Sequence, residues 1–147
     1  MANMKQFKKD YQHIVDSHSP KNKVGTNSLK AFFIGGIICT LGQGLTNLYM
    51  YWGLSFNEAS MLSTISLILV SMVCTAFNVY DDIGKFGGAG ALIPITGFAN
   101  SMVSSAMEYK KEGYIYGLGA KLFSIAGPVI VFGTLSSVVI GLIYYFV

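Results

Sequence analysis

The stretch YDDIGKFGGAGALIPITGFANSM, residues Tyr80–Met102, decides the fold of this chain. It holds five glycines, one proline, two adjacent carboxylates and a lysine, although the sequence around it is strongly apolar. Glycine and proline destabilise helices, and charged groups resist leaving water. Within a bilayer, irregular backbone persists only where protein buries it or where it lines a wet cavity. The stretch therefore indicates a site inside a membrane protein rather than a plain membrane span.

The rest of the chain supports a membrane location. Only 12% of the 147 residues are charged and 52% are hydrophobic, whereas soluble domains carry about 25% charged residues. The apolar residues are gathered into blocks long enough to cross a bilayer, which takes about 20 residues. We predict one all-α integral membrane domain with three to four transmembrane helices, a glycine-rich re-entrant or broken helix and a polar N-terminal tail.

The expected boundaries follow from the apolar blocks. The tail covers residues 1–28, and the membrane domain covers 29–147, with spans near 29–51, 60–80 and 125–147 and the re-entrant or broken segment at 86–107. Apolar residues in the tail recur at steps of three and four, which predicts a short amphipathic helix: Met4, Phe7, Tyr11, Ile14 and Val15. Gly127 and Pro128 are expected to break or kink the start of the last span.

Charge placement orients the chain. Five of the ten lysines precede the first span, a sixth, Lys30, lies at its start, and the sequence has no arginine. A lysine-rich flank is typical of the cytoplasmic side of a membrane, so the N-terminus is predicted to be cytoplasmic and a nucleic-acid partner is not expected.

Segment 86–107 allows two topologies. If it crosses fully, Lys110 and Lys111 lie outside; if it dips in and returns, they stay on the side of the tail. The lysine bias and the glycine and proline content favour the return.

Pro94 has two readings within this segment. An extended backbone before Pro94 would let a half-helix begin there. Its free N–H groups would favour an anionic group, as in broken transporter helices. The alternative is a kinked helix in which Gly97 serves packing. Both readings stay open at this point.

The candidate functional residues fall into two sets. Those assigned to a permeation path or to gating are Lys85, Gly87, Gly88, Gly90, Pro94, Gly97, Asn100 and Lys121. Those assigned to helix packing are Gly36, Gly44, Gly133 and Gly141, because small residues four apart let helix backbones approach closely. Gln43 and Asn47 fall near the first of these faces, so a pore-lining role for it is the alternative. The two lysines either offset the charge of an anion or extend to the headgroups.

No residue pattern indicates an enzyme, a cofactor or a metal. GxSxG and P-loop motifs are absent, and His13 and His18 lie in the tail with no nucleophile at a defined spacing. Cys39 and Cys74 fall in apolar blocks without metal-ligand spacing, so they are expected to be packing residues. The pair Asp81–Asp82 either holds a cation together with other ligands or marks a solvated helix end.

Three stretches resemble a known family: GGIICTLGQGL at Gly35–Leu45, the Tyr80–Met102 stretch, and EGYIYGLGAKLFSIAGPVIVFG at Glu112–Gly133. They are similar to the AC/AEB family of stage V sporulation membrane proteins, and the likeness covers nearly the whole chain from Lys30. The long lysine-bearing tail is more typical of the AC branch. Relatives often carry a basic residue where this chain has Asp82, so the resemblance transfers no charge-based role to that position.

The resemblance implies a multi-pass protein of the forespore or spore inner membrane, with its N-terminus on the spore-core side. Proteins of this family are associated with moving dipicolinic acid, together with calcium, into the forespore and with releasing it during germination. They work with sibling membrane subunits and with a soluble subunit that binds dipicolinate, and some members open under membrane tension.

Dipicolinate is a rigid dianion that needs a polar path across hydrocarbon. Three or four helices enclose such a path poorly, so the expectation is a subunit of an oligomeric channel. Gly90→Leu or Gly97→Leu is expected to block dipicolinate accumulation while the protein still inserts. The alternative is a non-conducting anchor that docks the soluble dipicolinate-binding partner and a paralogous pore protein.

Overall fold

A computed structural model describes residues 8, 11, 14, 15 and 23–146 of the chain. Within that part the protein is helical and contains no strand, which confirms the predicted all-α class. The elements are α2 (Val24–Tyr51), α3 (Phe56–Ala76), α4 (Val79–Gly87), α5 (Ala89–Leu92), α6 (Ile95–Tyr109), the short helices η1 (Lys110–Glu112) and η2 (Tyr114–Gly119), and α7 (Ala120–Phe146). The amphipathic helix predicted in the tail lies largely outside the described residues.

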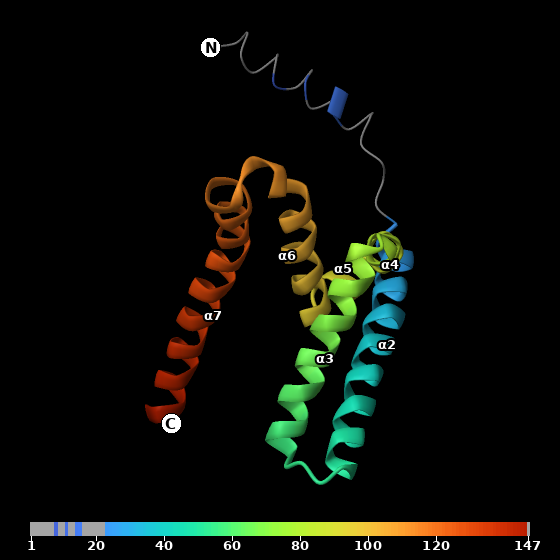
Figure 1. Ribbon diagram of the computed structural model, residues 1–147, viewed down its shortest axis with the longest axis vertical. Coiled ribbons are helices and arrows are strands. Elements are labelled where there is room, and N and C mark those ends of the chain that lie inside the picture. Colours follow the sequence, from blue (N-terminus) through green and yellow to red (C-terminus); the bar gives the residue numbers. More distant parts are fainter. Residues whose placement is uncertain (1–7, 9–10, 12–13, 16–22, 147) are drawn as a thin grey trace.

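Helices α2 and α3 form an antiparallel hairpin (Figure 1). The hairpin turns at a short loop after which Glu58 accepts hydrogen bonds from the N–H and the hydroxyl of Ser55, at 3.0 and 2.7 Å. This arrangement satisfies a donor that the start of α3 would otherwise leave free. Two polar bonds then join the helices: Ser63 donates to the Gly42 carbonyl at 2.8 Å, and the hydroxyls of Tyr49 and Ser66 lie 2.7 Å apart. Polar bonds of this kind hold helices together inside a membrane.

Three helical segments of the described residues are long and apolar enough to cross a membrane. The bounds of these helices differ from those predicted for the spans. Helix α2 starts at residue 24 rather than 29, because the polar residues before Lys30 continue the helix. Helix α3 starts and ends four residues earlier than predicted. Of the break or kink expected at Gly127 and Pro128, the break is wrong, since α7 runs through Pro128.

The predicted interruption between the second and last spans is confirmed as a twice-broken helix. Asn78 adopts φ 60°, ends α3 and turns the chain into α4; asparagine tolerates this left-handed region better than most residues. Gly88 separates α4 from α5 with φ 52° and ψ −127°. Pro94, with ψ 165°, separates α5 from α6.

The half-helix predicted to begin at Pro94 exists, and the kinked-helix alternative is wrong, because Pro94 is the N-cap of α6. The expected extended backbone before it is wrong as well. Leu92 still belongs to α5 and Ile93 has φ −75° and ψ −41°, which are helical values. The chain changes direction at Pro94 itself, whose ring fixes φ and leaves ψ free to become extended.

Helix α6 starts deep beside α3 and runs back toward the end of the molecule where α2 begins (Figure 1). Lys110 and Lys111 follow α6 and therefore lie at that end, which is the course expected of a segment that dips in and returns. Helix α7 then runs to the opposite end, where the α2–α3 loop also lies.

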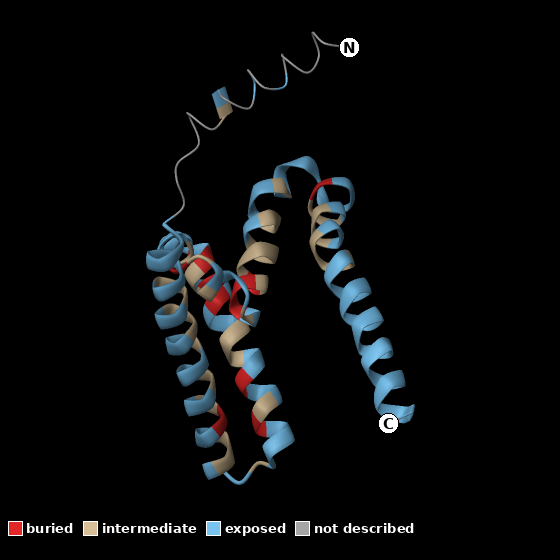
Figure 2. Ribbon diagram, turned by 180° about the vertical axis from the view of Figure 1, so that it is seen from behind, coloured by how far each residue is buried: buried red, intermediate tan, exposed pale blue. Residues whose placement is uncertain are grey.

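Burial is concentrated at the junction of α3, α4, α5 and α6 (Figure 2). Among the described elements, helix α7 packs mainly against α6 and η2. Every residue from 128 to 146 is exposed. The four glycines assigned to packing also lie in open space: a Cβ at Gly36, Gly44, Gly133 or Gly141 would meet nothing within 4 Å. The described chain itself therefore packs no helix against these positions, which leaves the predicted role to another molecule.

Candidate functional site

The twice-broken helix is held by a buried tyrosine. Tyr80, on α4, is 4% exposed, and its hydroxyl donates to the Ala91 carbonyl at 2.8 Å. The same oxygen lies 2.7 Å from the Thr96 hydroxyl. Because a phenol carries a single hydrogen, Thr96 is the donor in this second bond. One side chain thus joins α4 to the carboxyl end of α5 and to the first turn of α6.

Two further hydrogen bonds fix α6 to α3. The hydroxyl of Ser71, which is 1% exposed, donates to the Thr96 carbonyl at 2.6 Å. One turn further along both helices, the Thr75 hydroxyl lies 2.8 Å from the side-chain oxygen of Asn100 and 2.7 Å from the Ser71 carbonyl. Among the described residues, no buried side-chain nitrogen or oxygen is left without a partner. A fully satisfied buried network specifies one arrangement, whereas a partly satisfied one is costly.

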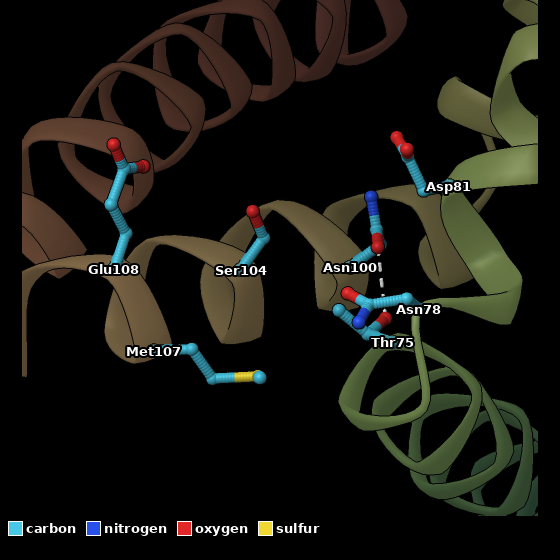
Figure 3. A pocket seen from close by; sticks show the side chains of 7 residues that line it. All are labelled: Thr75, Asn78, Asp81, Asn100, Ser104, Met107 and Glu108. Atoms are coloured by element: carbon cyan, nitrogen blue, oxygen red, sulfur yellow. Dashed lines mark hydrogen bonds between the residues drawn. The ribbon is translucent and has the colours of Figure 1, made fainter.

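A pocket of about 370 Å³ opens beside this network. Its walls come from the end of α3, the start of α4 and the length of α6 (Figure 3), and they are formed by Thr75, Asn78, Asp81, Asn100, Ser104, Met107 and Glu108. Asn100, Ser104 and Glu108 are four residues apart, so they project from one face of α6 toward the same side (Figure 3). The pocket is therefore a polar crevice next to the break.

The charges around this crevice are acidic. Asp81 and Glu108 are carboxylates, and no lysine lines the pocket. Lys85 instead pairs with Asp81 at 2.6 Å and lies 3.7 Å from Asp82. The hydrogen bond and the charge of Asp81 raise the pKa of Lys85 above its ordinary value of 10.5. Of the two readings of the aspartate pair, the solvated helix end fits the exposure of the Asp81 and Asp82 side chains, which are 67% and 85% exposed.

Lys85→Met is expected to leave thermal stability almost unchanged, because the paired side chains of Lys85 and Asp81 are 69% and 67% exposed and exposed ion pairs contribute little. A raised lysine pKa means that the pair's contribution is complete below pH 10.5 and is lost only above it. The unfolding midpoint of this variant in detergent should therefore match the parent at neutral pH. A large loss would show that the pair holds α4 in place.

The residues predicted to form a path do not gather at one place. Asn100 lines the acidic pocket, whereas Lys85 and Gly88 line a second pocket of about 450 Å³ between the start of α2 and the α4–α5 junction. The Lys121 ammonium lies 4.3 Å from the centre of the Tyr109 ring, which is a cation–π contact at the end of α6.

Three of the glycines assigned to the path lie where the structure leaves no room for a side chain. A Cβ at Gly90 would overlap the Ala31 carbonyl on α2, and one at Gly97 would overlap the Leu92 carbonyl. A Cβ at Gly87 would lie 2.8 Å from the Ile34 side chain. Leucine at Gly90 or Gly97 would therefore disturb the break itself, so these substitutions do not isolate an effect on a path.

Comparison with known proteins agrees with the membrane architecture. Residues 27–143 match the model of the SpoVAC/SpoVAEB sporulation membrane protein family. The chain belongs to this family. Its sequence is also 44% identical over 144 residues to Stage V sporulation protein AC of Bacillus subtilis (strain 168), covering 97% of this chain and 95% of that protein. No solved structure matches the chain significantly.

In this member of the SpoVAC/SpoVAEB family, sequence reasoning missed most of the crevice. Tyr80, Ser71 and Thr96 form the buried network, although nothing in the local pattern marks them as partners. Ser104 and Glu108 were not predicted either. The four-residue spacing from Asn100 through Ser104 to Glu108 is the signal that would have indicated a polar face on α6.

Proposed function

We propose that this sporulation membrane protein is a non-enzymatic subunit of a spore inner-membrane channel for dipicolinic acid and calcium. The observation that carries the proposal is the polar crevice beside a helix that breaks within the membrane domain. In membrane proteins, irregular backbone next to a polar cavity is typical of solute pathways. The choice of dipicolinic acid as the solute rests on the resemblance of the sequence to the sporulation membrane family. The proposed location in the forespore and spore inner membrane rests on the same resemblance.

The charge of the crevice favours one form of the solute. Glu108 would repel a free dianion, Lys85 offsets the charge of Asp81, and the first turn of α6 is buried around Thr96. A one-to-one complex of Ca²⁺ with the dianion carries no net charge. The hydroxyl and amide groups of the crevice are suited to a neutral, strongly polar solute of this kind. We therefore propose that calcium and dipicolinate pass together through the assembly.

The described chain does not enclose a path by itself. Helix α7 stands apart from the α2–α3 hairpin (Figure 1), and Ser104 and Glu108 on the wall of the crevice are exposed. The proposal therefore includes an oligomer, in which further copies or sibling membrane subunits close the wall. Membrane tension, acting on an assembly of this kind, is the proposed trigger for opening.

Reconstitution tests the proposal directly. Liposomes loaded with calcium dipicolinate would be prepared with this chain, with the sibling subunits, or with both, and terbium luminescence outside the vesicles would report release. Ser104→Leu is expected to slow release about tenfold or more, because replacing one hydrogen-bonding wall group costs about 1.4 kcal/mol or more. Ser104 is exposed and makes no side-chain hydrogen bond within the described residues, so folding should be unaffected.

The matched control is Ser136→Leu, an exposed position on α7 away from the crevice. It should release dipicolinate at the parent rate. Equal release rates for Ser104→Leu and the parent would show that the crevice is not part of the path.

A second candidate function is a non-conducting anchor that docks a soluble dipicolinate-binding partner and a paralogous pore. The absence of any lysine among the residues that line the crevice favours this alternative if the solute is the free dianion. The reconstitution separates the two functions. If the sibling subunits alone release dipicolinate from the liposomes, and Ser104→Leu in this chain does not change the rate, this chain is an anchor.

A further inference from the structure

The exposed face of α2 carries polar groups at membrane depth. Gly36, Thr40, Gln43, Gly44 and Asn47 recur at steps of three and four, so they lie along one face of the helix, here called the α2 stripe. All five residues are exposed. The face of α2 that carries Gly42 and Thr46 is packed against α3, and the Ala31 backbone packs against α5, so the stripe lies outside these contacts.

Lys30 and Tyr49 mark the depth of the stripe. The Lys30 ammonium lies 4.6 Å from the centre of the Phe86 ring at one end, and Tyr49 packs against Trp52 at the other. Lysine and aromatic residues are typical of the two membrane interfaces. The helix between them is about 28 Å long, close to the thickness of the hydrocarbon core. Gln43 lies nearly two turns inside the Tyr49 end and therefore within the hydrocarbon.

Lipid cannot satisfy the amides at this depth. The Gln43 amide nitrogen donates to the Asn47 side-chain oxygen at 2.9 Å. Two primary amides have four N–H hydrogens, so three of them and the Gln43 oxygen have no partner within residues 23–146. Unsatisfied amides in hydrocarbon are costly. This observation is independent of the small residues in the stripe, and it indicates that another protein surface covers the stripe.

We propose that the α2 stripe is the contact surface for a second copy of this chain. Amides are both donors and acceptors, so a surface of amides and small residues is complementary to itself. No charge in the stripe calls for a partner of the opposite sign. Two copies inserted in the same direction present parallel α2 helices, so each residue of a two-fold pair meets its own equivalent.

The shape of the surface suits this contact. A Cβ at Gly36 or Gly44 would meet nothing within 4 Å, so a second backbone is free to approach there. An adjoining apolar groove of about 310 Å³ offers room for side chains of the other copy; it is lined by Phe32, Phe33, Gly36, Ile37, Thr40 and Leu41. Close approach at small residues combined with amide hydrogen bonds is a common mode of association in membranes. The contact does not depend on which solute crosses the membrane.

Cysteine crosslinking of the full-length protein in liposomes tests the proposal. In a Cys39→Ala, Cys74→Ala background, Thr40→Cys and Gln43→Cys would each be oxidised and analysed on a denaturing gel. A covalent dimer is expected in high yield from both. Met61→Cys on α3 and Ile140→Cys on α7 are controls, because they are exposed apolar positions on other helices. Crosslinking at the controls equal to that at α2 would overturn the proposal.

Association energetics provide a second measurement. Energy transfer between labelled copies should show that Gln43→Leu and Asn47→Leu each raise the dissociation constant about threefold to tenfold. Gly36→Ile should weaken association further, while Gly141→Ile, at an equally open glycine on α7, should leave it unchanged. Association that requires a sibling subunit, or an equal loss from Gly141→Ile, would contradict a self-contact through α2.

Discussion

Gly90→Ala is expected to lower the unfolding midpoint of the protein by about 10 °C, given a cost of about 3 kcal/mol. The added Cβ would overlap the Ala31 carbonyl on α2. Both elements meet through backbone there, so no side-chain rotation relieves the overlap. Gly35 on α2 faces the same contact, because a Cβ at Gly35 would lie 3.4 Å from the Gly90 carbonyl oxygen.

Thermal unfolding in detergent, followed by far-ultraviolet circular dichroism, would measure the effect. Gly141→Ala is the matched control, since its Cβ would meet nothing and alanine is the better helix former. It should unfold at or slightly above the parent midpoint. If Gly90→Ala also unfolds at the parent midpoint, α5 does not pack on α2 as described.

Tyr80→Phe is expected to be the second most damaging conservative change. It removes one oxygen from a buried site and leaves the Ala91 carbonyl and the Thr96 hydroxyl without this partner. A buried polar group without a partner costs about 1–3 kcal/mol, which corresponds to a midpoint loss of about 5 °C for a chain of this size. Tyr116→Phe is the control, because Tyr116 is 89% exposed.

A double-mutant cycle sharpens this second test. Thr96→Val removes the hydroxyl that Tyr80 contacts, so the loss in Tyr80→Phe/Thr96→Val should be clearly smaller than the sum of the two single losses. Strict additivity would show that the two hydroxyls do not interact.

The sequence predicted the elements of the fold better than it predicted their contacts. Hydrophobic block length indicated three spans, and Pro94 indicated the start of a half-helix. Both features are local, because they depend on residues within one turn or one block. The start of α2 was misplaced since polar residues such as Asn27 are compatible with a helix end that leaves the hydrocarbon.

The candidate site depended on contacts that a local pattern does not encode. Gly90 was assigned to a path or to gating, and its close contact with Ala31, which is far away in the sequence, was not predicted. Lys85 was expected either to offset the charge of an anion or to extend to the headgroups, and the structure pairs it with Asp81 one turn earlier. The acidic crevice arises only when the end of α3 meets α6, so its charge was not accessible to inspection of the sequence stretch by stretch.

The separation of α7 from the hairpin has a consequence for biogenesis. Every buried contact of the break is complete once the ribosome has synthesised the chain through Tyr109, because Tyr80, Ser71 and Thr96 all precede that point. Chains acquire structure from the N-terminal part first during synthesis. The core of this protein is therefore able to assemble in the bilayer while the last helix is still being translated.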